Sequence, residues 1–200
     1  MSHPPALVMC GGRGSRLEPA VGETEKPLVE IGGRPMVDRV CGALQESRVG
    51  ETYAAVSPQA PETAARLADA DVTVIETPGE GYVEDLTAAL DAVGTPAVTV
   101  SADLPLLQAA HVDSAIAAAD GGSVAVCVPL SVAEEVGASA DTTIDHEGRP
   151  VVPTGLNVVG EGPDRRVVVE AELLAVNVNR PADLRLAKTI FRESDYSIFE

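Results

Sequence analysis

Short apolar runs recur along the chain, separated by amphipathic stretches. The runs are rich in alanine and β-branched residues and predict strands at Ala6 to Cys10, Thr52 to Val56, Val72 to Glu76, Ala97 to Ser101 and Ser123 to Val128. The segments between them carry Ala, Leu, Arg and Glu at helical spacing and predict helices at Pro35 to Ser47, Pro61 to Ala70, Tyr82 to Val93 and Ala110 to Ala119. This alternation of strand and helix predicts an α/β fold.

The apolar strands lack polar alternation, which is typical of strands covered on both faces. We therefore expect a Rossmann-like three-layer sandwich, with a mostly parallel twisted central sheet and helices on both faces. No repeat or linker divides the chain, so residues 1–200 are interpreted as one domain.

The pattern loosens over residues 136–169 into Gly, Pro, Asp and Thr, with short extended pieces such as Gly155 to Val159. We interpret this region as an insertion or lid on the edge of the sheet. Regular patterns return with a predicted strand at Leu173 to Val178 and a helix at Pro181 to Phe191 that has proline in its first turn. Residues 193–200 show no clear pattern and are interpreted as a tail or an oligomer contact, which leaves a homodimer open.

The net charge is -17, with 14 basic residues among 200. Clustered Lys and Arg are needed to bind nucleic acid, so nucleic acid is excluded as a main partner. The excess of carboxylates is typical of proteins from a salt-rich cytoplasm, where self-repulsion is screened. The first five residues lack the pattern of a signal peptide, and no apolar run is long enough for a transmembrane segment, so we expect a cytoplasmic protein. Cys10, Cys41 and Cys127 lie far apart and are interpreted as core residues.

The stretch ALVMCGGRGSRLEP, residues 6–19, places three glycines directly after the first predicted strand. Glycines let backbone N–H groups approach phosphate oxygens without interference from side chains. Arg16 can form a bidentate contact with a phosphate, and Lys26 can add a point charge. The loop therefore predicts a nucleoside triphosphate site, whose cradle consists of Gly11, Gly12, Arg13, Gly14 and Ser15.

This loop is neither a Walker A sequence nor G-x-G-x-x-G, because Leu17 stands where the third glycine of that motif would be. The combination G-G-x-G-x-R-L followed by Lys26-Pro27 resembles the signature of the nucleotidyltransferase superfamily with a glycosyltransferase-A-like fold. The resemblance implies transfer of a nucleoside monophosphate from an NTP to a phosphorylated acceptor, with release of pyrophosphate.

Such a reaction needs a metal ion to neutralise charge, and a carboxylate at the end of a central strand suits Mg²⁺. Asp103 follows the predicted strand at residues 97–101 and resembles the aspartate of the superfamily's S/G-D-x-P pattern; the alternative is that it caps a turn. The stretch NVNRPADL, residues 177–184, resembles the N/D-x-N/D-x-P-x-D-L element. This implies that Asn177 is a second metal or phosphate ligand, that Asn179 orders the turn, and that Asp183 starts a helix.

Two loops at the carboxyl ends of strands can hold the base. The first contains Ser57 and Pro58, and the second contains Gly79, Gly81, Tyr82 and Asp85. Backbone groups of the glycines and the carboxylate of Asp85 can pair with the N1–H and amino group of guanine. An ordinary helix start is the alternative for Tyr82 and Asp85.

The segments G-x-G-Y-V/I-E-D-L, S-x-D-L, P-x-G-x-N-V-V and N-V-N together resemble the GTP:adenosylcobinamide-phosphate guanylyltransferases of archaeal type, from Ala6 to about Phe191. This implies transfer of GMP from GTP to the phosphate of adenosylcobinamide phosphate, a phosphorylated corrinoid, in cobalamin assembly. It also implies Mg²⁺ as cofactor, Arg16, Lys26 and Asp103 as catalytic residues, and Thr154, Gly155 and Asn157 near the acceptor. Transfer to molybdopterin or a sugar phosphate on the same fold, and a non-catalytic GTP-binding module, remain alternatives.

Overall fold

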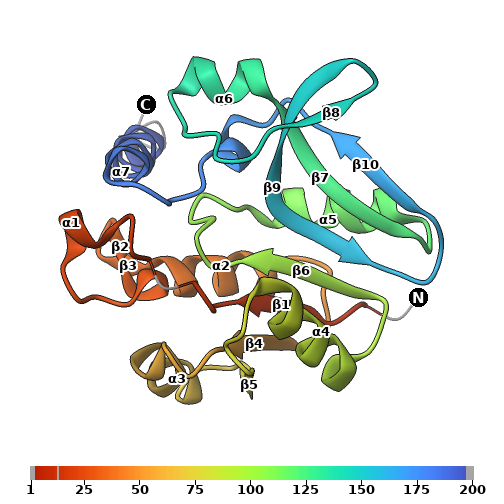
Figure 1. Ribbon diagram of the computed structural model, residues 1–200, viewed down its shortest axis with the longest axis horizontal. Coiled ribbons are helices and arrows are strands. Elements are labelled where there is room, and N and C mark those ends of the chain that lie inside the picture. The colour runs from red at the N-terminus through yellow and green to blue at the C-terminus, as the bar shows by residue number, and fades with distance from the viewer. Residues whose placement is uncertain (1–2, 13, 197–200) are drawn as a thin grey trace.

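A mixed sheet forms the centre of the protein (Figure 1). The computed structural model describes residues 3–12 and 14–196, apart from the side chains of residues 195 and 196. The strand order is β10-β7-β9-β6-β1-β4-β5, and β8 pairs with β9. The strands are β1 (Ala6–Met9), β4 (Thr52–Val56), β5 (Thr73–Glu76), β6 (Ala97–Ser101), β7 (Ser123–Pro129), β8 (Ile144–His146), β9 (Arg149–Val159) and β10 (Asp164–Val168). Because β5, β4, β1 and β6 pair in parallel, their carboxyl ends share one edge.

Helices cover both faces of the sheet, as the sequence predicts. They are α2 (Met36–Gln45), α3 (Pro61–Ala68), α4 (Tyr82–Val93), α5 (Ala109–Ala119) and α6 (Leu130–Val136). Buried residues of α2, α3, α5 and α6 join one face of the sheet in the main core. On the opposite face, Ala89 of α4 packs with Leu7, Met9 and Ala55. Three layers result, and the prediction of the fold class is confirmed.

A second core lies at the carboxyl edge and joins the two ends of the chain. Leu17, Ile31 and Met36 pack there against Val178 and Leu184. The elements around this core are α1 (Glu18–Val21), η1 (Lys26–Leu28), β2 (Glu30–Ile31), β3 (Arg34–Pro35), η2 (Glu172–Ala175) and α7 (Pro181–Tyr196). Figure 1 shows the blue α7 beside the red segment that holds α1 and β2. Burial of this core fixes the loop after β1 against residues about 160 positions away in sequence.

Three expectations for the second half of the chain were wrong. Residues 136–169 are not confined to the sheet edge, because β9 lies inside the sheet and pairs antiparallel with both β6 and β7. Residues 173–178 form no strand; η2 is followed by irregular backbone. Helix α7 continues to Tyr196, so residues 193–196 of the supposed tail are helical, and residues 197–200 lie outside the described part. Glycine, proline and short apolar runs concealed these elements, whose conformations depend on tertiary pairing.

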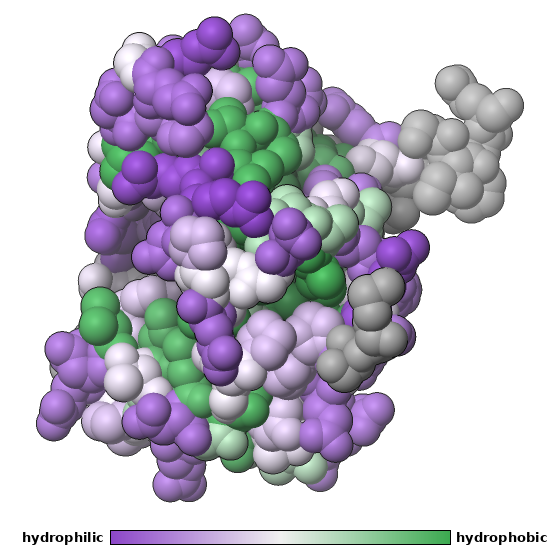
Figure 2. All heavy atoms as spheres, turned by 90° about the vertical axis from the view of Figure 1, so that its right-hand side faces the viewer, coloured by the Kyte–Doolittle hydropathy of each residue, from purple (hydrophilic) through white to green (hydrophobic). Residues whose placement is uncertain are grey.

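Hydrophilic residues cover much of the face shown in Figure 2, and hydrophobic residues appear in separate patches between them. The negative charge is therefore compatible with an apolar interior. Among the described residues, no helix combines the length and apolar character needed to cross a membrane.

Candidate active site

The glycine loop after β1 wraps around Lys26. Gly14 has a φ of +66°, and a Cβ added there would lie 2.9 Å from the Cβ of Lys26. A Cβ at Gly12 would lie 3.9 Å from Cδ of the same lysine. The loop ends in a turn in which the N–H of Leu17 donates to the carbonyl of Gly14, and the Leu17 side chain is fully buried. Only glycine combines this positive φ with so close an approach to the lysine.

The ammonium group of Lys26 joins two distant segments of the chain. Nζ donates to Oδ2 of Asp103 at 2.5 Å and to Oδ1 of Asn179 at 2.6 Å. The Lys26 and Asp103 side chains are only 12% and 14% exposed, so water screens this ion pair weakly. Among the hydrogen bonds of the described residues these use two of the three ammonium donors, which leaves one for a ligand.

Glu25, which the sequence analysis missed, anchors this lysine from the preceding position. Its carboxylate accepts the N–H groups of Glu62 and Thr63 at 2.8 and 2.7 Å and the Thr63 hydroxyl at 2.6 Å. It thereby caps the first turn of α3, whose own N-cap, Ala60, provides no side-chain acceptor. The partner lies 38 residues away, so no local motif could have indicated this contact.

Asp103 follows β6, and one of its two carboxylate oxygens has no hydrogen-bond partner in the described residues. Its backbone is fixed because its carbonyl accepts the N–H of Val178 at 2.9 Å. Oδ2 accepts from Lys26, whereas Oδ1 is buried and has no hydrogen-bond partner in the described residues. A buried carboxylate oxygen without a partner is costly, and a hard divalent cation would satisfy it. No group of three or more His, Cys, Asp or Glu suited to a metal occurs in the described part of the chain.

The two asparagines of the C-terminal element do not share one strand face. The side chain of Asn179 reaches Lys26, while Oδ1 of Asn177 lies 3.6 Å from the Cβ position of Gly155. Asp183 is fully buried and accepts the N–H groups of Asn179 and Arg180, at 3.1 and 2.9 Å, as the helix-start interpretation predicted. Asn179, rather than Asn177, is therefore the asparagine that orients the lysine.

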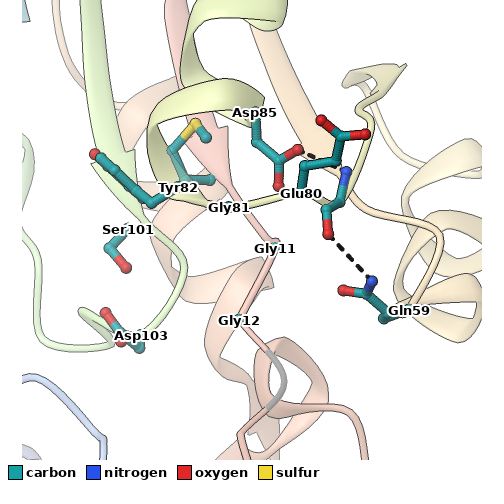
Figure 3. A pocket seen from close by; sticks show the side chains of 11 residues that line it. Gly11, Gly12, Gln59, Glu80, Gly81, Tyr82, Asp85, Ser101 and Asp103 are labelled. Carbon is teal, nitrogen blue, oxygen red and sulfur yellow. Dashed lines mark hydrogen bonds between the residues drawn. The ribbon is translucent and has the colours of Figure 1, made fainter.

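A pocket of about 470 Å³ opens beside these groups (Figure 3). Its lining includes the predicted Gly11, Gly12, Gly79, Gly81, Tyr82, Asp85 and Asp103, together with Met9, Gln59, Glu80 and Ser101, which were not among the predicted site residues. The lining comes from the last residues of β1 and β6, the loops after β1, β4, β5 and β6, and the first turn of α4. The strands end at one edge because they are parallel.

Asp85 organises the side of the pocket formed by the loop after β5. Its carboxylate is 3% exposed, and Oδ1 accepts the N–H of Gly79 at 2.7 Å. Gln59 donates from Nε2 to the Gly79 carbonyl at 3.3 Å, and both contacts are visible in Figure 3. Oδ2 lies 3.0 Å from the Cβ position of Gly11, so a larger residue at position 11 would collide with it. Asp85 thus fixes the conformation of the loop after β5 at Gly79, and it also borders the pocket.

Ser57 and Pro58 lie behind this loop. Ser57 is 3% exposed, and a Cβ at Gly79 would come within 2.9 Å of Pro58 Cδ. They support Gly79, whereas Gln59 from the same loop borders the pocket directly.

Tyr82 stands at the pocket mouth, 51% exposed, next to Val83 at 68%. Partial burial of its hydroxyl, and secondarily the negative charge of Asp103, raise the pKa of Tyr82. At neutral pH its phenol therefore stays protonated and can donate a hydrogen bond to an anionic ligand.

Other predicted residues lie apart from the pocket lining. Arg16 is 64% exposed and forms an ion pair with Asp141. Ser15 is in the turn between Gly14 and Leu17, and Arg13 lies outside the described residues.

The predicted acceptor residues on β9 divide between its two faces. The Thr154 hydroxyl is buried, donates to the carbonyl of Val126 and accepts from the N–H of Leu156, and its contact with an acceptor stays a prediction. Asn157 donates from Nδ2 to the Thr99 hydroxyl at 3.4 Å. Gly155 lies nearest the site, because a Cβ there would be 3.1 Å from Cβ of Ser101. Alternation along a strand places residues 154 and 155 on opposite faces.

A parallel sheet edge with a glycine loop, a part-buried lysine and a strand-end aspartate is the arrangement expected of an NTP transferase. Residues 6–161 match the MobA-like NTP transferase domain, and the chain belongs to this family. Adenosylcobinamide-phosphate guanylyltransferase from Methanocaldococcus jannaschii is 30% identical over 94% of this chain and 97% of its own length. This chain belongs to the same family as that enzyme.

Two further comparisons extend the likeness. A 2-C-methyl-D-erythritol 4-phosphate cytidylyltransferase from Frankia casuarinae is 35% identical over 73% of this chain, and the match spans 53% of that relative. A solved structure described as a hypothetical transferase from Thermus thermophilus superposes with a TM-score of 0.71 at 19% identity, covering 91% of this chain and 99% of that one. The structural likeness supports the nucleotidyltransferase fold.

Proposed function

We propose that this protein transfers GMP from GTP to the phosphate of adenosylcobinamide phosphate and releases pyrophosphate. The observation that carries the proposal is that Gly11, Gly12 and Asp103 line one pocket, while Lys26, which packs on the glycine loop, forms an ion pair with that Asp103. The choice of nucleotide and acceptor rests on the full-length relative from M. jannaschii, whose name describes this reaction.

The reaction is an in-line displacement at the α-phosphorus. An oxygen of the acceptor phosphate forms the new P–O bond, and the bond to the β-phosphate oxygen breaks, so pyrophosphate leaves with that electron pair. A phosphate dianion is already nucleophilic and needs no general base. The work of the protein is therefore positioning and electrostatic stabilisation.

Each residue then has a defined role. Backbone N–H groups of the glycine loop hold phosphate oxygens, and the remaining Lys26 donor contacts the α-phosphate. Asp103 would hold Mg²⁺ through Oδ1; bound there, the ion would neutralise phosphate charge. The Asp85 carboxylate and the backbone of Gly79 and Gly81 border the volume assigned to guanine.

The test is acceptor-dependent pyrophosphate release from GTP, compared with ATP, CTP and UTP. We expect release with GTP and adenosylcobinamide phosphate together. Release with CTP instead would favour the specificity of the cytidylyltransferase relative, and GTP binding without release would indicate a non-catalytic module. Asp85→Asn keeps an oxygen for the Gly79 N–H but removes the charge, so it should reduce the preference for GTP while the protein stays folded.

A further inference from the structure

The carboxylate of Asp141 lies between two guanidinium groups, those of Arg16 and Arg180. Its Oδ2 pairs with Nη1 of Arg16, and its Oδ1 accepts from Nη2 of Arg180 at 2.5 Å. The Asp141 side chain is 22% exposed, whereas those of Arg16 and Arg180 are 64% and 53% exposed. Each carboxylate oxygen is thus bound to one arginine, and we call Arg16 and Arg180 together the two-arginine clamp.

Each arginine lies within two positions of a residue that contacts Lys26. Arg16 lies two positions after Gly14, which packs on the lysine side chain. Arg180 directly follows Asn179, which accepts from the lysine at 2.6 Å. The clamp therefore borders the predicted phosphate site, although the sequence analysis assigned no role to Arg180.

Asp183 ties together the two segments that face each other in this clamp. Its Oδ2 accepts the backbone N–H of Arg180 and the hydroxyl of Ser139, at 2.9 and 2.8 Å. Its Oδ1 accepts the backbone N–H of Ser139 at 3.0 Å. Ser139 lies two residues before Asp141. The buried carboxylate of Asp183 therefore fixes both the turn that carries Arg180 and the segment that carries Asp141.

We propose that Arg16 and Arg180 together bind the β- and γ-phosphates of the triphosphate, and that Asp141 occupies their clamp until nucleotide displaces it. This inference rests on the proposed function, since it requires a triphosphate in the adjacent pocket. Guanidinium groups bind carboxylate and phosphate oxygens with the same geometry. An exposed ion pair contributes little stability, so a multiply charged pyrophosphate group can displace a single carboxylate.

The proposal predicts opposite effects for the two partners. Asp141→Asn removes the competing charge and should tighten binding of GTP and inorganic pyrophosphate by about threefold to tenfold, with little change for GMP. Arg180→Ala removes a charge-assisted contact and should weaken GTP and pyrophosphate binding by about tenfold or more. A purely structural role for Asp141 would give weaker binding in Asp141→Asn, because the bridge between two loops would be lost.

Matched controls isolate the local effect. Asp113→Asn removes a carboxylate from another exposed ion pair, that with Arg48 at 3.6 Å, and changes the net charge by the same amount. Arg185→Ala removes an exposed guanidinium from the same helix that follows Arg180. Both controls should bind GTP and pyrophosphate as the wild type does.

The experiment is calorimetric titration of each variant with GTP, GMP, inorganic pyrophosphate and adenosylcobinamide phosphate. Asp141→Asn binding pyrophosphate no more tightly than Asp113→Asn would overturn the displacement. Arg180→Ala that loses affinity for the acceptor but keeps it for pyrophosphate would assign Arg180 to the acceptor phosphate and overturn the clamp.

The two proposals can fail separately. Wild-type protein that turns over GTP, with both variants binding pyrophosphate normally, would refute the clamp alone. Opposite shifts in pyrophosphate affinity, without acceptor-dependent release from GTP, would support the clamp and refute the proposed reaction.

Discussion

Lys26 and Asp103 form a weakly exposed ion pair, with Nζ 2.5 Å from Oδ2, across 77 residues of sequence. Asp103 lines the pocket with Lys26 bound to it, and its Oδ1 has no hydrogen-bond partner in the described residues. This combination suits a site for both phosphate and a cation, because the ammonium can donate to an anion while the free carboxylate oxygen could bind a metal ion.

Lys26→Ala should lower the rate of GMP transfer by about 10² to 10³. The substitution removes a preorganised donor at the α-phosphate, and it also leaves Asp103 in a poorly exposed position without its cation. Pyrophosphate release under saturating GTP measures the effect. Lys188→Ala is the matched control, since Lys188 is the only other lysine in the chain, and it should retain the wild-type rate. Near-normal turnover in Lys26→Ala would refute the assignment.

The meeting of the glycine loop and Asp103 at one pocket follows from the order of the strands and their parallel pairing. Strands β4 and β6 match their predicted bounds, and parallel pairing brings their carboxyl ends together with that of β1. A motif at the end of each strand therefore predicts a shared site once the sheet is assumed parallel. This is why Gly11, Gly12 and Asp103 could be placed from sequence.

Contacts made by irregular backbone could not be placed in this way. The sequence predicts a strand that ends at Val178 and a metal or phosphate ligand at Asn177, but the segment is irregular and its turn is held by Asp183. Of the two asparagines, it is Asn179 that bonds to Lys26. Strand β9 contains Pro150, Pro153 and a Gly155 with a φ of +84°, and so lacks a simple strand pattern. Its place between β6 and β7 depends on long-range pairing that no short window contains.

Gly14→Ala should impair catalysis and stability together, because the added Cβ would be both strained and in contact with Lys26. Gly22→Ala is a control with nearly the same φ, +64° against +66°, but nothing lies within 4 Å of its Cβ position. We expect both variants to lose roughly 1–3 kcal/mol of unfolding free energy. Only Gly14→Ala should weaken GTP binding, and equal affinities in the two variants would argue against close packing of the loop on the lysine.

Glu25→Ala should reduce kcat by about tenfold through displacement of Lys26, and should cost about 1–2 kcal/mol through loss of the α3 cap. Thr63→Val also removes a hydrogen bond of this cap, but it leaves the residue next to the lysine unchanged. It should therefore lower the unfolding free energy while kcat is preserved. Glu25→Gln retains one of the two acceptor oxygens and should recover part of the rate. If Glu25→Ala and Thr63→Val lower kcat equally, Glu25 supports the fold alone.

The buried cysteines should make stability fall in alkaline solution. Burial, reinforced by the negative charge of Asp38, raises the pKa of Cys41 from about 9 to about 11, and burial raises the pKa of Cys10 as well. Below pH 9 both folded and unfolded chains keep these protons, so the thiols contribute no pH dependence. Above pH 9 the unfolded chain releases them first and binds fewer protons than the folded chain, so the free energy of unfolding decreases as pH rises toward 11.

Denaturant titrations at pH 8 and pH 10.5 test this dependence. The raised pKa of Cys41 corresponds to a loss of unfolding free energy on the order of 2 kcal/mol by pH 11. Cys41→Ala should be less stable than the wild type at pH 8, but its unfolding free energy should fall with pH by about 2 kcal/mol less.

At pH 8 the folded protein should react slowly with a thiol reagent, because its cysteines are buried and protonated. Unfolding in guanidinium chloride should make all three thiols reactive. A Cys41→Ala curve parallel to that of the wild type from pH 8 to 10.5 would mean that Cys41 ionises equally in both states, contrary to its burial in the core.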